Sequence, residues 1–194
     1  MKTRKTLKVL KTFKVYVISV LIALFSQPLI ANEFSAQIKS ASLEKYKDWY
    51  ELKATVDYKL SPIATEAIQS SIGLLWRLKI ELKQTQTLWD KTLINSEHSY
   101  EIRYHALLNS YSVTNQSTAK SRRFTSLAAA LDSMSRIRDI KVIKTNAIKK
   151  DTAYTVAIKL QFDREALPLP LRPVAYLYTD WDLSSDWYLW SLQP

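Results

Sequence analysis

The sequence predicts a mainly β fold, an antiparallel β-sandwich or open barrel of about six to eight strands with two short helices. Four segments alternate apolar and polar residues with a period of two, which is typical of strands with one buried and one solvated face. The regular alternation of strands and helices that builds a parallel sheet is missing. The apolar content of 47% is enough for a core without disulfide bonds, since the chain has no cysteine.

The strands are predicted by where this alternation runs. The four strongly alternating segments are residues 50–60, 76–83, 100–108 and 154–162. The apolar positions change parity after Leu108, which predicts a turn or bulge near Asn109. Weaker strands are expected over residues 34–43 and 140–144. The connecting segments expected to be loops are residues 115–123 and the proline-rich residues 166–173.

Two helices are expected from capping signals and from a helical period. Ser61 and Pro62 suit an N-cap and a first helical turn, so a helix is expected over residues 62–71. Gly73 stands where a C-terminal cap would end it. The second helix is expected from about residue 125 to 137, where apolar residues repeat at i, i+4 and i+7.

Residues 1–31 have the three parts of a secretory signal peptide. Six Lys or Arg without an acid precede an apolar run over residues 15–25 and a helix-breaking, small-residue end. Cleavage is expected before Asn32, which leaves residues 32–194 as a single mainly β domain in the periplasm. The alternative is an uncleaved signal anchor, because residues 15–31 reach the lower limit of a membrane span. The anchor would tether the domain to the inner membrane.

Composition excludes several kinds of function. The chain has 28 basic and 18 acidic residues, and without the six cations of the leader its net charge falls from +10 to +4. That balance disfavours a nucleic-acid partner. With one glycine in the chain, glycine-rich phosphate loops and the nucleophile elbow are impossible. His98 and His105 are an odd number of residues apart on one predicted strand, so they cannot share a metal ion within it. The sequence predicts no catalytic residue, no cofactor and no metal site.

The C-terminal tail, residues 180–190, combines three Trp, one Tyr and three Asp. Asp180, Asp182 and Ser184 have the spacing of a calcium loop, but its sharp-turn glycine and distal glutamate are missing. Aromatic capture of a ligand is a second interpretation, and structural closure of a sheet core by the Trp rings is the favoured one. The aromatic candidates for an interaction surface are Trp181, Trp187, Tyr188 and Trp190.

The main basic cluster of the predicted domain forms around residues 120–123. Its members are Lys120, Arg122 and Arg123, with Arg136, Arg138 and Lys141 further along the chain. A solvated loop is the commoner explanation of such a cluster, and contact with anionic lipid head groups is the functional one. Arg122 and Arg123 are therefore the basic candidates for an interaction surface.

Four segments together resemble a known family. Residues 104–107, 124–131, 167–173 and 180–190 are similar to the DUF4390 family of uncharacterised proteobacterial exported proteins. The resemblance implies a Gram-negative envelope protein without an assigned activity. It also implies genes that neighbour those of a ribosomal-RNA methyltransferase and of a sensor kinase. An accessory role in envelope signalling, with a sensor kinase as partner, is the expectation that follows. The family supplies no catalytic residues to transfer.

The function expected from the sequence is a non-enzymatic module that binds a protein partner in the envelope, because no set of acids, bases or nucleophiles can be assembled. One alternative is a binder of a small or lipidic ligand in the sheet core, which a deep apolar pocket would favour. The other alternative is a carboxylate-dependent hydrolase, which a cleft joining several acidic side chains would favour. Its candidate carboxylates are Asp163, Glu165, Asp180, Asp182 and Asp186.

Overall fold

The computed structural model describes residues 34–86 and 89–192. These residues belong to one compact unit, Glu33–Pro194. The leader expected over residues 1–31 lies outside the described residues, and so does the choice between cleavage and anchoring. In the described part of the chain, no helix has both the length and the apolar character that crossing a bilayer requires.

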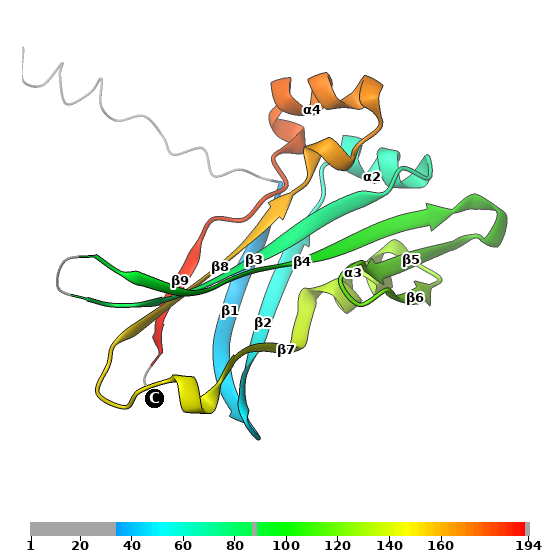
Figure 1. Cartoon of the computed structure of the whole chain (residues 1–194). Coiled ribbons are helices and arrows are strands. Elements are labelled where there is room, and N and C mark those ends of the chain that lie inside the picture. Colours follow the sequence, from blue (N-terminus) through cyan, green and yellow to red (C-terminus); the bar gives the residue numbers. More distant parts are fainter. Residues whose placement is uncertain (1–33, 87–88, 193–194) are drawn as a thin grey trace, which may run out of the picture. The chain divides into compact units, whose positions relative to one another are not determined.

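Two open antiparallel sheets make up the domain (Figure 1), so the predicted mainly β fold is confirmed. The three-stranded sheet has the order β1-β2-β7 and consists of β1 (Ser35–Tyr46), β2 (Trp49–Lys59) and β7 (Arg136–Lys144). The six-stranded sheet has the order β6-β5-β4-β3-β8-β9. Its strands are β3 (Leu74–Gln84), β4 (Lys91–His105), β5 (Ser110–Asn115), β6 (Lys120–Phe124), β8 (Tyr154–Phe162) and β9 (Tyr188–Leu192).

Short helices connect the strands. The α-helices of the described residues are α2 (Pro62–Gln69), α3 (Leu127–Ser135) and α4 (Arg172–Leu177). Single 3-10 turns are η1 (Ala106–Leu108), η2 (Thr145–Ala147), η3 (Arg164–Ala166), η4 (Leu169–Leu171) and η5 (Thr179–Trp181). Because α3 follows β6 and precedes β7, it leads the chain from the six-stranded sheet to the three-stranded one.

The core lies on the faces that the alternation predicts. On β3 and β8, every second residue is buried, and the antiparallel register places those residues side by side. Trp76 is fully buried, its ring contacts those of Tyr58 and Phe162, and its indole N–H donates to the Leu183 carbonyl oxygen at 2.9 Å. The interior is therefore organised around one aromatic cluster.

Two segments predicted to be loops have regular structure. The segment 115–123 contains most of β6, a strand that alternation does not reveal because its first two inward positions carry Lys120 and Arg122 instead of apolar residues. The proline-rich segment 166–173 contains η4 and the start of α4, because prolines occupy the first turns of both, where no N–H is needed. The expectation of a strand-free segment 166–173 is confirmed.

Gly73 does not have the capping role predicted for it. The helix α2 ends at Gln69 with Ser70 as its C-cap, and Ser71 is the residue that takes the left-handed conformation, with φ of 63°. A Cβ on Gly73 would lie 2.0 Å from Oε1 of Glu101 and 2.6 Å from Nη2 of Arg103. The glycine therefore makes room for an ion pair on β4.

The tail closes one edge of the core, as the favoured interpretation predicts. Trp181 is buried and stacks on Phe162 with ring centroids 6.0 Å apart. Before β9 begins, the tail already runs beside β8: the Ser185 hydroxyl accepts from the Leu160 N–H at 2.9 Å. The Ser184 hydroxyl accepts from the Phe162 N–H at 3.1 Å. Serine hydroxyls thus replace the missing strand partner of β8.

Candidate functional site

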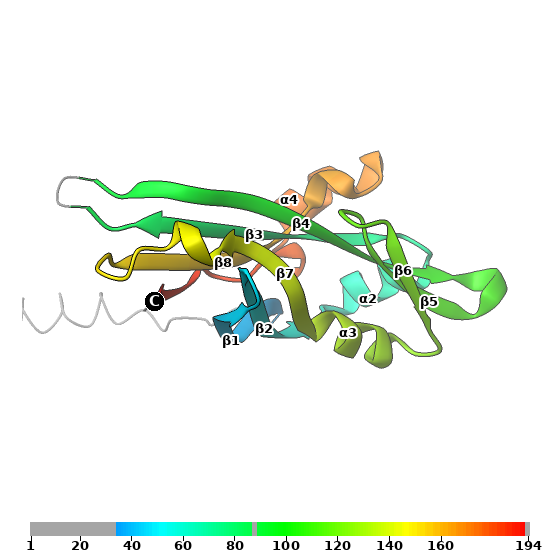
Figure 2. The same ribbon diagram turned by 60° about the horizontal axis from the view of Figure 1, so that its bottom comes forward.

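A basic cleft opens where the two sheets diverge. It lies between β6, an edge strand of the six-stranded sheet, and β7, an edge strand of the three-stranded sheet. The helix α3 contacts strands of both sheets and joins these two edges (Figure 2). The cleft has a volume of about 470 Å³ and adjoins a second hollow of about 550 Å³. The residues common to both are Arg122, Ser133, Arg136, Arg138 and Asp139.

The sheet register explains why basic side chains of β6 line the cleft. Arg122 pairs with Val113 of β5, which pairs with the buried Ile102 of β4, so all three share the inner face. Arg123 is the next residue of the strand and lies on the opposite face. Neighbouring arginines in the sequence are therefore separated by the sheet, with only Arg122 in the cleft.

A β-bulge contributes two of the residues of β7 that line the cleft. Leu52 of β2 pairs with Ile140 and Ala54 pairs with Ile137, so two residues of β7 stand opposite one residue of β2. The two residues are Arg138 and Asp139, and both line the cleft. Asp139 has φ of 62°, in the left-handed region that aspartate tolerates better than most side chains.

The charge of the cleft is strongly positive. Its lining contains five cations and one acid; the cations are Lys120, Arg122, Arg136, Arg138 and Lys141, and the acid is Asp139. Arg136 forms an ion pair with Asp132. Within residues 34–86 and 89–192, the other four cations, Lys120, Arg122, Arg138 and Lys141, have no carboxylate within ion-pair distance. Four uncompensated cations in one concave surface favour an anionic group there.

Neutral and apolar groups form the inner part of the cleft. Val113, Met134 and Ile137 are buried apolar residues of its lining. Burial lowers the pKa of His98 and raises the pKa of Tyr100 above its ordinary value. Both groups are therefore held in their neutral forms at neutral pH, where they can hydrogen-bond but carry no charge.

The stability of the domain is expected to fall on acidification because of His98. The folded pKa of His98 lies below the unfolded value of about 6.5, so the unfolded chain binds the proton more readily. The His98 contribution is complete above about pH 6.5 and is lost as the pH falls through the folded pKa. His98→Gln should weaken this pH dependence in urea unfolding curves. His105→Gln is the matched control, since His105 lies on the other face of β4 and bonds to Ser112. An unchanged pH slope in His98→Gln would contradict the assignment.

The aromatic interaction candidates lie away from the cleft. The Trp181 ring is buried in the core, and Trp187 is exposed just before β9. Tyr188 and Trp190 are half-buried on β9, with ring centroids 5.9 Å apart. Because β9 and β6 are opposite edges of the six-stranded sheet, these aromatics and Arg122 do not form one site.

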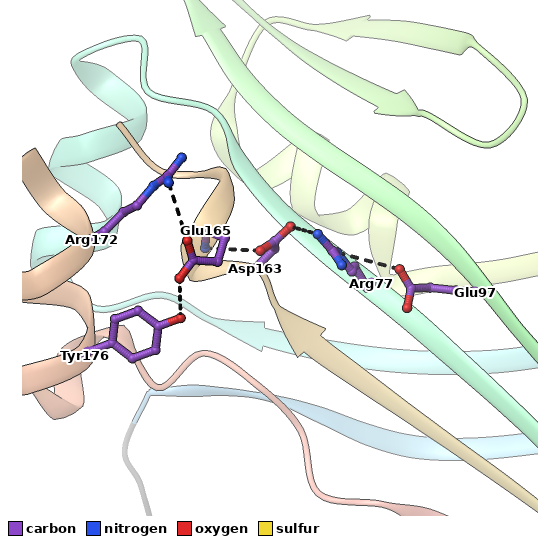
Figure 3. A network of polar contacts seen from close by, with 6 residues as sticks. All are labelled: Arg77, Glu97, Asp163, Glu165, Arg172 and Tyr176. Atoms are coloured by element: carbon purple, nitrogen blue, oxygen red, sulfur yellow. Dashed lines mark hydrogen bonds and ion pairs between the residues drawn. The ribbon is translucent and has the colours of Figure 1, made fainter. Parts of the chain in front are cut away.

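Three of the five carboxylates proposed for a hydrolase, Asp163, Glu165 and Asp182, pair with arginines, and Figure 3 shows the first two. Asp163 pairs with Arg77, which also lies 3.6 Å from Glu97. Glu165 accepts from the Tyr176 hydroxyl at 2.6 Å and lies 3.4 Å from Arg172.

Asp182 lies 3.6 Å from Arg164. Among the residues that the structure describes, no group of three or more acidic, histidine or cysteine side chains could hold a metal ion. These ion pairs hold short helices in place, and none of the five candidate carboxylates lines the basic cleft or the hollow beside it.

The sequence indicates the basic cluster but not the residues that lie next to it in the fold. Asp139 and the inner pair His98 and Tyr100 were missed, because their proximity depends on which strand edges face each other. The charged period of β6, with Lys120 and Arg122 two residues apart, is the one sequence signal that could have indicated a basic inner face.

The comparisons with known proteins give one finding. A protein-family model described as a domain of unknown function (DUF4390) matches residues 33–191. No curated protein and no solved structure matches the chain.

Proposed function

The chain belongs to the DUF4390 family, and we propose that its domain is a non-enzymatic interaction module that binds an acidic, extended segment of a protein partner in the basic cleft. The observation that supports this function is the group of uncompensated cations Lys120, Arg122, Arg138 and Lys141 between two edge strands. The partner is an envelope protein in this proposal, and the family resemblance suggests a sensor kinase.

The edge strands favour an extended ligand. In the described sheets, β6 pairs with β5 and β7 pairs with β2, so each has one edge without a neighbouring strand. Such an edge presents backbone N–H and C=O groups that an added strand can satisfy. Acidic side chains of that strand would meet Arg122 or Arg138, and apolar ones would meet the inner part of the cleft.

A small or lipidic anion is the second candidate ligand. The cleft volume of about 470 Å³ is in the range of small-molecule sites. The interior between the sheets is occupied by fully buried side chains such as Trp76 and Ile80, so such a ligand would also use the cleft. Both candidate ligands, the acidic segment and the small anion, would bind the same cations. They differ in whether a partner protein or a small molecule copurifies with the domain.

Charge reversal at one of two neighbouring arginines tests the proposal. Wild-type protein, Arg122→Glu and Arg123→Glu are used to capture partners from envelope extracts of the native host, with mass spectrometry as the readout. The two variants change the net charge equally, but only Arg122 lies in the cleft. We expect Arg122→Glu to reduce recovery of the partner at least about tenfold, which corresponds to about 1.4 kcal/mol. Arg123→Glu should keep it.

A defined peptide then separates an acidic segment from other ligands. The segment of the captured partner that crosslinks to the cleft is synthesised with its Asp and Glu residues and with Asn and Gln in their place. The proposal is supported if the acidic peptide binds and the Asn/Gln peptide does not, and if salt and Arg122→Glu both weaken that binding. A partner that binds equally to both arginine variants contradicts it. A stoichiometric small anion in place of a partner favours the second candidate.

A further inference from the structure

An apolar surface at one end of the domain belongs neither to the core nor to the cleft. We call it the α4 platform; its residues are Leu169, Val174, Tyr176, Leu177 and Tyr178, all exposed. Leu177 is 80% exposed and Leu169 is 74% exposed. Val174 and Leu177 of α4 and its C-cap residue Tyr178 are spaced i, i+3 and i+4, and Ala175 of the same helix is buried against the domain. The α4 platform is therefore an outward-facing apolar surface.

Polar contacts hold the α4 platform in a fixed position (Figure 3). The Tyr176 hydroxyl donates to Glu165 at 2.6 Å, and this hydrogen bond raises the pKa of Tyr176. Arg172 donates to the Leu167 carbonyl oxygen at 2.9 Å and pairs with Glu165. The exposed side chains thus belong to a braced element that can bind as a preformed surface.

The charges beside the α4 platform are balanced. Arg172 pairs with Glu165, and Arg164 lies 3.6 Å from Asp182. The cation of Arg164 also lies 5.4 Å from the centre of the Tyr176 ring. A nearly neutral surface of leucine, valine and tyrosine suits the interface of a bilayer, where tyrosine is enriched, better than it suits an acidic protein.

The described chain begins at the same end of the domain. The Ala36 N–H, at the start of β1, donates to the Leu183 carbonyl oxygen at 3.3 Å. Leu183 follows η5, which contacts α4. The 33 residues that precede Phe34 include the apolar residues 15–31. We propose that, when residues 15–31 remain attached as an anchor, the α4 platform lies in the interface of a lipid bilayer and so sets the orientation of the domain on the membrane. This inference does not depend on the function of the basic cleft.

Single cysteines test this orientation, because the chain has none of its own. Tyr178→Cys and Tyr46→Cys are compared in the full-length protein, reconstituted into phosphatidylcholine vesicles and labelled with a polarity-sensitive nitrobenzoxadiazole probe. The two tyrosines are 58% and 56% exposed, and Tyr46 lies at the far end of β1 from Ala36. We expect the probe at residue 178 to shift to the blue and to be quenched by brominated lipid, consistent with insertion to about 5–10 Å. The probe at residue 46 should do neither.

A further substitution and a high-salt measurement distinguish apolar insertion from attraction between charges as the origin of the quenching. Leu177→Asp should abolish the quenching at residue 178 while leaving the circular dichroism spectrum unchanged, because the Leu177 side chain is exposed. Quenching that persists at about 1 M salt agrees with apolar insertion, since exposed charges are then screened within about 3 Å. Probes equally unquenched at both sites overturn the proposal. Concentration-dependent burial of residue 178 without lipid would also overturn it, because a second copy would then cover the α4 platform.

Discussion

Replacing Trp76 with alanine is expected to lower the free energy of unfolding by about 3–5 kcal/mol, the range for a large aromatic residue in a packed core. Trp76 is fully buried and its ring contacts both Tyr58 and Phe162, one from each sheet. Its loss would leave a cavity between the sheets and would leave the Leu183 carbonyl oxygen without its indole donor. Urea unfolding followed by far-UV circular dichroism measures the effect without relying on tryptophan fluorescence.

Two conservative variants separate the hydrogen bond from the packing. The Trp76 indole N–H donates to Leu183, whereas the buried Trp181 indole N–H has no hydrogen-bond partner among the described residues. Trp76→Phe should therefore destabilise the domain more than Trp181→Phe, since only the first substitution breaks a hydrogen bond.

A surface tryptophan provides the control for these core variants. Trp89 is 75% exposed, so Trp89→Ala should change the free energy of unfolding by no more than about 0.5 kcal/mol. Equal effects of Trp76→Ala and Trp89→Ala would show that the aromatic cluster does not stabilise the fold as described.

The strands that were predicted well are those whose burial is one-sided. In β2, β3 and β8 the inner positions are apolar and the outer ones are mostly polar, so a period of two is visible in the sequence. The predicted segment 154–162 coincides with β8. The turn predicted near Asn109 is also present, with Asn109 in the left-handed conformation at φ of 43°. These strands and this turn depend on residues close together in the sequence, so the sequence alone is enough to predict them.

The basic cleft could be predicted only in part, because it depends on contacts between residues distant in the sequence. Residues 120–123 and Arg136 are near neighbours along the chain, and their charge could be read from the sequence. Arg122 and Arg123 lie on opposite faces because β6 is a strand. The strand is hard to recognise in the sequence because charged residues occupy inner positions. That β6 and β7 line one cleft depends on how the two sheets pack against each other, which no local pattern specifies.

For the tail, the sequence predicts closure of the core but not the hydrogen bonds that close it. Its closure role was predicted from aspartate, serine and tryptophan content. The structure shows that the serines are the important polar groups, because β9 pairs with β8 only over Tyr154–Ile158. Beyond that point, Ser185 exchanges backbone and side-chain hydrogen bonds with Leu160, at 2.8 and 2.9 Å.

Ser185→Ala is accordingly expected to lower the free energy of unfolding by about 1–3 kcal/mol, the cost of leaving a buried backbone N–H without a partner. The side chain is buried, and its hydroxyl both accepts from the Leu160 N–H and donates to the Asp186 carbonyl oxygen at 2.8 Å. Ser184→Ala should cost less, because its bond to Phe162 is only partly buried and water can replace it. Urea unfolding measures the stability, and hydrogen exchange should show faster exchange at the Leu160 amide.

The matched control for this prediction is Ser191→Ala, on the exposed face of β9. It removes the same hydroxyl from the same end of the chain, and for it we expect a change within about 0.5 kcal/mol. Ser185→Thr keeps the hydroxyl and should retain protection of the Leu160 amide even if the added methyl group disturbs packing. If Ser185→Ala were no more destabilising than Ser191→Ala, the hydroxyl would not replace a strand partner, and closure of the edge would depend on the aromatic rings alone.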